Sequence, residues 1–273
     1  MSSTSLTPLA ALIGDDQQLL DTFMRALMTA DGVGLGAAKE LRYLLLPRSH
    51  EFPAKKHGPQ GAGWAAPGGN GVRDGHCRDG IVKVTWVQKH SREIPAVVIL
   101  LARFDVGLSN QEWQAVESPL VKDINRFQAS LAMKHTKVML VLFKVGTSNL
   151  INKSQSQEVL DERVFTVRRQ CEMDSRLVTV LTASDLTPLN TSTRRLVKHA
   201  KELAATHYSA AVSRLQSVEK LTSAYPVRQQ HLPHRARLFF KLANMHEFLG
   251  QVEGARAAYL EIWSILEDMI ASF

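Results

Sequence analysis

Two apolar stretches decide the fold, Ile94-Pro95-Ala96-Val97-Val98-Ile99-Leu100-Leu101 and Val138-Met139-Leu140-Val141-Leu142-Phe143. Strands that are apolar at every position are covered on both faces, as parallel strands are inside an α/β layer. Between the two stretches, apolar residues recur at steps of three and four, which is the spacing of one helix face. These residues are Trp113, Val116, Leu120, Ile124, Phe127 and Leu131. The order predicts a β-α-β unit with a right-handed crossover.

Three more apolar stretches complete the predicted sheet, because each is bounded by turn residues. They are Leu6–Ile13, Leu41–Leu46 and Leu177–Leu181. A helical stripe from Leu19 to Met28 separates the first two, and another from Leu160 to Cys171 precedes the last. About five strands that alternate with helices predict a flavodoxin-like, mostly parallel sheet, with a crevice at the carboxyl ends of its first and third strands.

The pattern becomes purely helical after residue 185. One apolar stripe runs from Ser192 through a helix of about thirty residues, and we expect its His207 to be a buried, hydrogen-bonded histidine. A helix pair, Arg235–Leu249 and Gly254–Met269, follows. We therefore predict an α/β domain over residues 1–185 and a helical domain over residues 186–273.

The helix pair resembles a tetratricopeptide (TPR) repeat, because Leu249–Ala255 matches its turn and the small Ala255 allows close helix approach. We expect it to start a TPR-like α-solenoid. One such unit leaves an apolar face without a neighbour. That face is Leu260, Trp263, Leu266, Met269, Ile270 and Phe273. Another subunit would cover it, or the chain would be the leading piece of a longer protein.

Charge and cysteine content point to a cytosolic protein. The net charge of +7 suits an anionic partner, nucleic acid or membrane, but the dense basic group Arg194, Arg195, Lys198 and Lys201 lacks interleaved aromatics, which favours a solvated helix face. Two cysteines give no disulfide framework. The longest apolar run falls short of the ~20 residues that span a bilayer. We expect no transmembrane segment and no nucleic-acid partner.

Several motifs that suggest ligands have simpler explanations. Gly32–Ala37 fits a dinucleotide fingerprint, but a helix enters it and a strand leaves it, the reverse of the working order. The Gly- and Pro-rich stretch at residues 53–80 is predicted to be a surface loop. Its His57, His76 and Cys77 lack the spacing of zinc ligands. We expect no cofactor and no catalytic site.

The alternative hypothesis is a receiver-like phosphoacceptor. Asp15, Asp16, Asp105 and Thr147 follow predicted strands, and clustered carboxylates there would hold Mg²⁺ and accept a phosphoryl group. The residues after Leu181 include no lysine to complete such a pocket. Acidic residues in turns commonly cap helices, and this explanation is favoured.

Four stretches together resemble the foie gras family, subunit 11 of the trafficking protein particle (TRAPP) complex, over its N-terminal portion. They are Leu46–Pro53; Gly80–Lys83 with Trp86, Lys89, His90 and Ile94–Val98; His135–Val138; and Arg235–Met269. The resemblance implies an α/β start that leads into an α-solenoid, in a non-enzymatic scaffold subunit of a vesicle-tethering complex.

The same resemblance implies work in transport between endoplasmic reticulum and Golgi and in autophagy. It also implies a cytoplasmic location, peripheral at the Golgi or the ER-Golgi intermediate compartment. The implied partners are other complex subunits and, indirectly, a Rab-type GTPase and membranes. The motif positions Gly80, Lys83, Trp86, Lys89, His90 and Pro95 are interpreted as structural. Family members are much longer than this chain.

Overall fold

A computed structural model describes residues 6–31, 41–52, 82, 85–145, 153–182, 191–223 and 231–272. Several sequence predictions fall outside the described residues. They concern the glycine motif at 32–37, the loop at 53–80 with His57, His76 and Cys77, and the single positions Gly80, Lys83, Thr147 and Phe273.

The chain divides into two compact units. The sheet unit comprises residues 7–52 and 95–207, and the helical unit comprises residues 1–6, 53–94 and 208–273. The long helix α5 (Thr191–Ser223) contributes residues to both. The domain boundary predicted between residues 185 and 186 stays a prediction.

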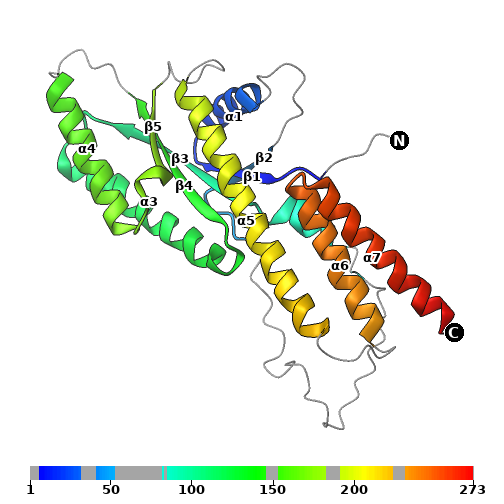
Figure 1. Ribbon diagram of the computed structural model, residues 1–273. Coiled ribbons are helices and arrows are strands. Elements are labelled where there is room, and N and C mark those ends of the chain that lie inside the picture. The colour runs from blue at the N-terminus through cyan, green and yellow to red at the C-terminus, as the bar shows by residue number, and fades with distance from the viewer. Residues whose placement is uncertain are drawn as a thin grey trace, which may run out of the picture. The chain divides into compact units, whose positions relative to one another are not determined.

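The sheet unit contains a five-stranded parallel sheet with the order β2-β1-β3-β4-β5 (Figure 1). The strands are β1 (Leu9–Gly14), β2 (Arg42–Pro47), β3 (Val97–Asp105), β4 (Lys137–Val145) and β5 (Val178–Leu181). This is the flavodoxin-like order, so the predicted fold class is confirmed. The first strand forms although its sequence signal is weak, and its residues are completely buried.

Helices cover the sheet because its central strands are apolar on both faces. They are α1 (Gln17–Asp31), α3 (Asn110–Leu131) and α4 (Lys153–Gln170). One core joins alternate strand residues such as Ile13 and Leu100 to Phe127 of α3 and Val167 of α4. The neighbouring strand residue Leu12 points to the other face. From β1 the chain steps to β2 at one edge of the sheet, and it then adds β3, β4 and β5 toward the other edge. Because crossovers are right-handed, α1 therefore lies on the face opposite to α3 and α4.

Short turns set where the elements of the sheet unit begin and end. Ser109 caps α3 through a capping box with Glu112, and this fixes the exit from β3. The turn η2 (Ala132–Lys134) closes α3, and His135 adopts a left-handed conformation with φ of 58° before β4. A second turn, η3 (Ser175–Leu177), precedes β5.

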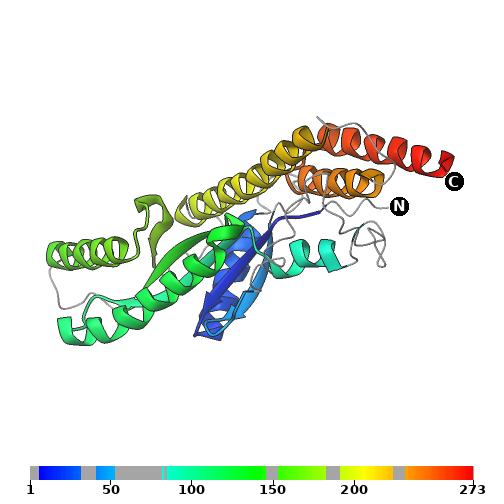
Figure 2. The ribbon, with the colours of Figure 1, turned by 90° about the horizontal axis from the view of Figure 1, so that it is seen from below.

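The helical unit contains α2 (Thr85–Gln88), the π-helical turn η1 (Lys89–Glu93), the end of α5, α6 (Leu232–Phe248) and α7 (Val252–Ala271). The segment from Thr85 to Glu93 is therefore helical. The helices α6 and α7 lie side by side, as the orange and red ribbons of Figure 2 show. Gly250 turns the chain between them with φ of +68°, which a glycine adopts without strain.

Candidate interaction surfaces

The crevice at the carboxyl ends of β1 and β3 is the place where ligands bind in flavodoxin-like sheets. A hollow of about 220 Å³ lies there, with an apolar floor that includes Leu20, Leu101 and Leu120 and a rim of Asp16 and Arg103. The predicted acidic residues Asp15 and Asp16 therefore do lie at this crevice, as the strand order requires. The side chains that pair with Asp15 and Asp16 determine whether these carboxylates are available to a ligand.

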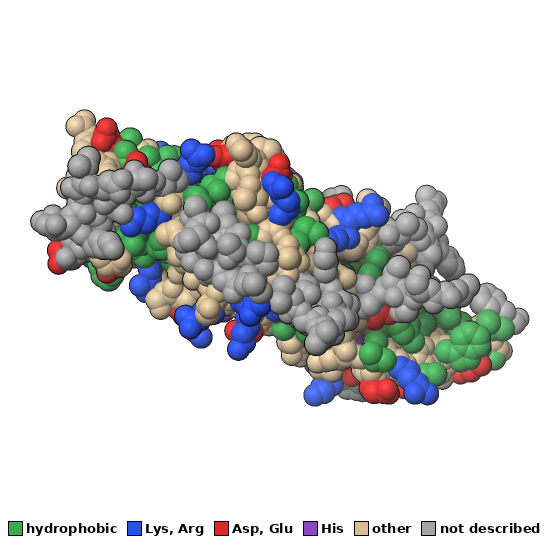
Figure 3. All heavy atoms as spheres, turned by 90° about the horizontal axis from the view of Figure 1, so that it is seen from above, with side chains coloured by type: hydrophobic (Ala, Val, Ile, Leu, Met, Phe, Trp, Pro, Cys, Tyr) green, Lys and Arg blue, Asp and Glu red, His purple; other side chains and the backbone are tan. Residues whose placement is uncertain are grey.

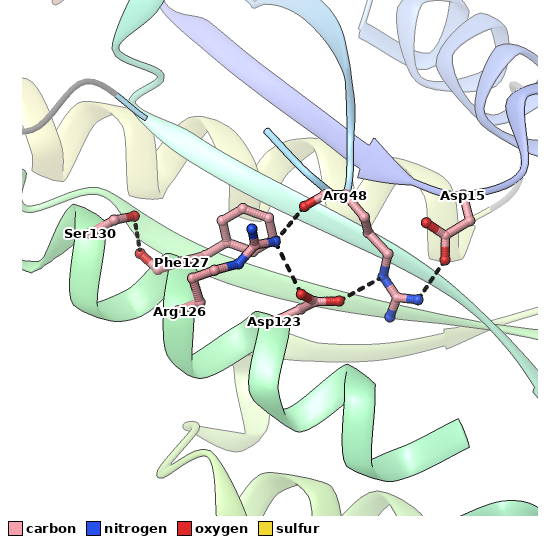
Figure 4. A network of polar contacts seen from close by, with 6 residues as sticks. All are labelled: Asp15, Arg48, Asp123, Arg126, Phe127 and Ser130. Carbon is pink, nitrogen blue, oxygen red and sulfur yellow. Dashed lines mark hydrogen bonds and ion pairs between the residues drawn. The ribbon is translucent and has the colours of Figure 1, made fainter. Parts of the chain in front are cut away.

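Arginines neutralise the carboxylates of the crevice. Arg48, which follows β2, donates to Asp15 at 2.6 Å and lies 3.2 Å from a carboxylate oxygen of Asp123 on α3 (Figure 4). Arg126 pairs with the other oxygen of Asp123 at 3.0 Å and donates to the backbone carbonyl of Arg48. Arg103 of β3 pairs with Asp16. This network joins β1, β2, β3 and α3 to one another.

Asp16 also caps a helix, as the simpler explanation of these carboxylates predicted. Its side chain accepts a hydrogen bond from the backbone N–H of Leu19 at 2.9 Å, in the first turn of α1. That bond, with a smaller contribution from Arg103, holds the pKa of Asp16 below its ordinary value. Asp16 is thus a cap and an ion-pair partner.

Asp105 does not join the other two carboxylates. In the sheet register Ile13 of β1 is level with Leu100 of β3, so Asp105 lies two to three residues farther along, about 7 to 10 Å. Its side chain accepts the backbone N–H of Gly107 at 2.8 Å and closes its own turn. Among the described residues, no three acidic, histidine or cysteine side chains meet in a way that would hold a metal ion. Among the described residues, the three carboxylates of the receiver-like hypothesis therefore do not converge.

A buried arginine that the sequence analysis missed holds the turn after β3. Arg163 of α4 donates to the carbonyl oxygens of Asp105 at 3.1 Å and Leu108 at 2.5 Å, and its guanidinium lies 5.2 Å from the ring centre of Trp113. Only 6% of Arg163 is exposed. Its spacing on the helix stripe beside Leu160 and Val167 was the available signal, but an arginine on such a face is ordinarily read as solvated.

Two positions of the family-like stretches have structural partners. The hydroxyl of Thr136 donates to the carbonyl of Pro95 at 2.8 Å and lies 3.5 Å from Nδ1 of His207. All three residues are buried. The prediction that His207 is a buried histidine with a polar partner is confirmed, while the structural interpretation of Pro95 stays a prediction.

The α6–α7 interface has the close packing predicted for a TPR-like turn. Ala255, Ala258 and Ile265 form the buried face of α7. A Cβ on Gly254 would come within 2.7 Å of the His246 ring, so only a glycine fits there without movement of the ring. Tyr259 of α7 donates to Glu247 of α6 at 2.9 Å. The two helices therefore form one rigid hairpin.

The outer face of α7 carries the predicted apolar surface. Leu260, Trp263 and Ile270 have 61%, 63% and 74% of their surface exposed. Leu266 and Met269 are partly buried, and Phe273 lies outside the described residues. Figure 3 shows hydrophobic side chains gathered over α7, at the lower right. The Trp263 indole donates to Glu267 at 2.7 Å, which holds the ring against the helix.

The motif residues Trp86, Lys89 and His90 lie in the helical unit. The rings of Trp86 and His90 are 4.5 Å apart, and Trp86 meets Phe240 of α6 edge to face at 6.3 Å. Lys241 of α6 lies over the Trp86 ring at 5.9 Å. These contacts attach α2 and η1 to α6.

The basic group on α5 is a solvent-facing surface. Arg194, Arg195 and Lys198 are exposed, while Lys201 is partly buried. No described helix combines the length and the hydropathy of a membrane-spanning segment.

The class that these features define is a flavodoxin-like sheet unit accompanied by a TPR-like helical hairpin. Comparison with known proteins adds a similarity to one family. Residues 77–189 match the family model described as the trafficking protein particle complex subunit 11 N-terminal domain. The resemblance seen in the sequence is confirmed.

Curated relatives with the same name agree with this match. The proteins named trafficking protein particle complex subunit 11 from Bos taurus and Homo sapiens are each 22% identical to the chain over 232 residues, or 85% of its length. The Gallus gallus protein of that name is equally similar. The matched region covers 18% of each relative, so the chain spans about a fifth of their length.

Proposed function

We propose that this protein is an interaction subunit of a TRAPP-type vesicle-tethering complex and works as a scaffold without catalytic turnover. The observation that carries the proposal is the similarity to subunit 11 over 85% of the chain. The carboxylates of the crevice support a structural role for that site, because Asp15 and Asp16 are paired with arginines of neighbouring elements.

The proposed place of action is the cytoplasmic surface of the Golgi and of the ER-Golgi intermediate compartment, in transport from the endoplasmic reticulum and in autophagy. The partners in this proposal are other subunits of the tethering complex. In this proposal the chain contacts a Rab-type GTPase and membranes only indirectly, through other subunits of the assembled complex.

The proposed contact surface is the outer face of α7, with Leu260, Trp263, Leu266, Met269, Ile270 and Phe273. Its occupant is a second helical hairpin of the complex. The support is the kind of hairpin that α6 and α7 form, because TPR-like hairpins bury their outer faces by stacking on neighbouring hairpins. Exposed apolar area of this kind is typical of protein interfaces.

The test is to mix the purified chain with purified subunits of the tethering complex and measure association by analytical ultracentrifugation. We expect a stable complex that the change Trp263→Ser weakens by at least about tenfold, as expected of a buried aromatic anchor. The matched control is Phe165→Ser, which removes an aromatic with a similar exposure of 60% from α4. A folded, monodisperse chain that associates with none of the subunits contradicts the proposed function. Equal weakening by both changes contradicts the proposed surface.

A further inference from the structure

Acidic side chains accompany the apolar ones on the outer face of α7. The helix carries four carboxylates, which are Glu253, Glu261, Glu267 and Asp268. Its only cation is Arg256, and all five of these charged side chains are exposed. The whole chain has a net charge of +7, so α7 carries a charge of the opposite sign to that of the chain as a whole.

Apolar and acidic residues form two stripes along α7. Val252, Trp263 and Ile270 follow one another at steps of eleven and seven positions, which are about three and two helical turns, so they lie on one side of the helix. Leu260 lies between this stripe and the acidic one. The acidic stripe consists of Glu253, Glu261 and Asp268. The outer face of α7 is therefore apolar along one half and acidic along the other.

Neither stripe is covered within the described part of the chain. Val252, Trp263 and Ile270 have 72%, 63% and 74% of their surface exposed. No ion pair among the described residues includes a carboxylate of α7. A partner that buries the apolar stripe brings its own flank next to these carboxylates. Cations on that flank add attraction, whereas acidic side chains there add repulsion.

The negative charge of α7 decides between the classes of occupant. Nucleic acids and the anionic lipids of cytoplasmic membrane surfaces are repelled by the carboxylates. A second copy of the chain that met α7 with its own α7 would place the two acidic stripes in one symmetric contact, which is unfavourable for the same reason. A helix with an apolar stripe and a basic flank complements both halves of the outer face.

We propose that the outer face of α7 binds an amphipathic helix of another subunit, with Lys and Arg on the flank that meets Glu253, Glu261 and Asp268. This inference rests on the proposed function, because it names the chemistry of the hairpin that α7 contacts there. The apolar stripe extends about 27 Å from Val252 to Ile270, which corresponds to about five turns of the bound helix.

The test uses the full chain and two fluorescein-labelled peptides of about twenty residues, followed by fluorescence anisotropy at low salt. Both peptides carry leucine at helical steps of three and four, and the adjoining flank has lysine in one peptide and glutamate in the other. We expect the lysine peptide to bind at least about tenfold more tightly. Since the net charge of +7 by itself repels the lysine peptide, this preference reports the local charge of α7.

Two pairs of charge changes locate the binding. The site variant is Glu261→Gln with Asp268→Asn, and the control variant is Glu158→Gln with Glu162→Gln on α4. Both pairs lie at exposed positions and remove two negative charges. We expect the site variant to bind the lysine peptide about fivefold more weakly and the control to change less than about twofold. The change Trp263→Ser should weaken the same binding by about tenfold.

The other outcomes contradict the proposal. Equal binding of the two peptides, undetectable binding of the lysine peptide, or equal weakening by site and control variants overturns it. A chain that sediments as a dimer, which Trp263→Ser dissociates, overturns it because the occupant is then a second copy. Trp263-dependent binding to vesicles of phosphatidylcholine and phosphatidylserine without peptide binding overturns it because the ligand is then a membrane.

The peptide test and the mixing test with complex subunits fail separately. A chain that associates with the subunits but does not bind the lysine peptide keeps the proposed function and loses this inference. A chain that binds the lysine peptide through α7 but associates with none of the subunits loses the proposed function and keeps a basic helix as its ligand.

Discussion

The crevice of the sheet unit and the surroundings of His90 in the helical unit differ in the charges that act there. At the crevice, Arg48 and Arg103 meet Asp15, Asp16 and Asp123, so each guanidinium has a carboxylate partner. The charges that act on His90 of η1 are those of the cations Lys89, Lys241 and Arg214. The difference teaches that arginine and lysine at a candidate site indicate a ligand only where the protein has left them without a partner.

Removal of the buried, hydrogen-bonded arginine Arg163 should lower the free energy of unfolding more than the other changes. The change Arg163→Ala takes away two hydrogen bonds to carbonyl oxygens and the cation above Trp113, so we expect the free energy of unfolding to fall by about 3 kcal/mol. Urea denaturation measures it. The control Arg169→Ala, at an exposed position of the same helix, should change it by less than about 0.5 kcal/mol. Equal effects would show that Arg163 does not hold the turn after β3.

The free energy of unfolding should fall in acid, because burial and three neighbouring cations disfavour protonation of His90 in the folded protein. The pKa of His90 is about 4 in the folded protein and near its ordinary 6.5 in the unfolded chain, so the unfolded chain binds the proton first as pH falls. The stability contributed by neutral His90 is present above pH 6.5 and is lost down to about pH 4, by about 3 kcal/mol. Denaturation at several pH values measures the slope.

The matched comparison for this slope is His90→Gln. His50 and His234, whose pKa values burial also lowers, contribute a slope of the same sign and remain in the variant. In the His90→Gln variant, the slope of the unfolding free energy with pH should therefore decrease only by the contribution of His90. An unchanged slope would mean that burial and the charges of Lys89, Lys241 and Arg214 do not lower the pKa of His90.

The smallest effects give the most direct contrast between the two regions. Arg48→Met removes a partnered cation, and we expect the free energy of unfolding to fall by about 1 kcal/mol. Lys241→Met keeps the apolar stem and removes a charge that burial and Arg237 disfavour, so we expect no loss and a gain of up to about 0.5 kcal/mol. Thermal unfolding of the two variants side by side measures both. Losses of the same size would show that Arg48 and Lys241 contribute equally to stability.

Much of the sheet unit was predictable because its signal is local and repeated. Continuous apolar runs such as Val97–Leu101 predict buried parallel strands, and the alternation of strands with helices predicts the flavodoxin-like order. The first strand, Leu9–Gly14, also forms where its weak signal indicated. The helix pair was predictable for the same reason, since its glycine turn and small residues set the approach of α6 and α7.

The partners of charged side chains were not predictable. Sequence spacing placed Asp15 and Asp16 at the crevice, but it did not show that Arg48, 33 residues away, and Arg103, 87 residues away, would neutralise them. It placed Asp105 in the same group, although the register of β3 carries Asp105 past the others. It gave no sign that Arg163 would be buried.

The sequence by itself determined which segments become strands and helices, because hydrophobic periodicity and turn residues act over a few neighbouring positions. It also determined the family resemblance, through short stretches in a fixed order. Only the tertiary structure decided which charges meet a partner and which do not, as at Arg48 and Lys241. The physical reason is that an ion pair depends on two atoms within about 4 Å, and chain packing between distant residues sets that distance.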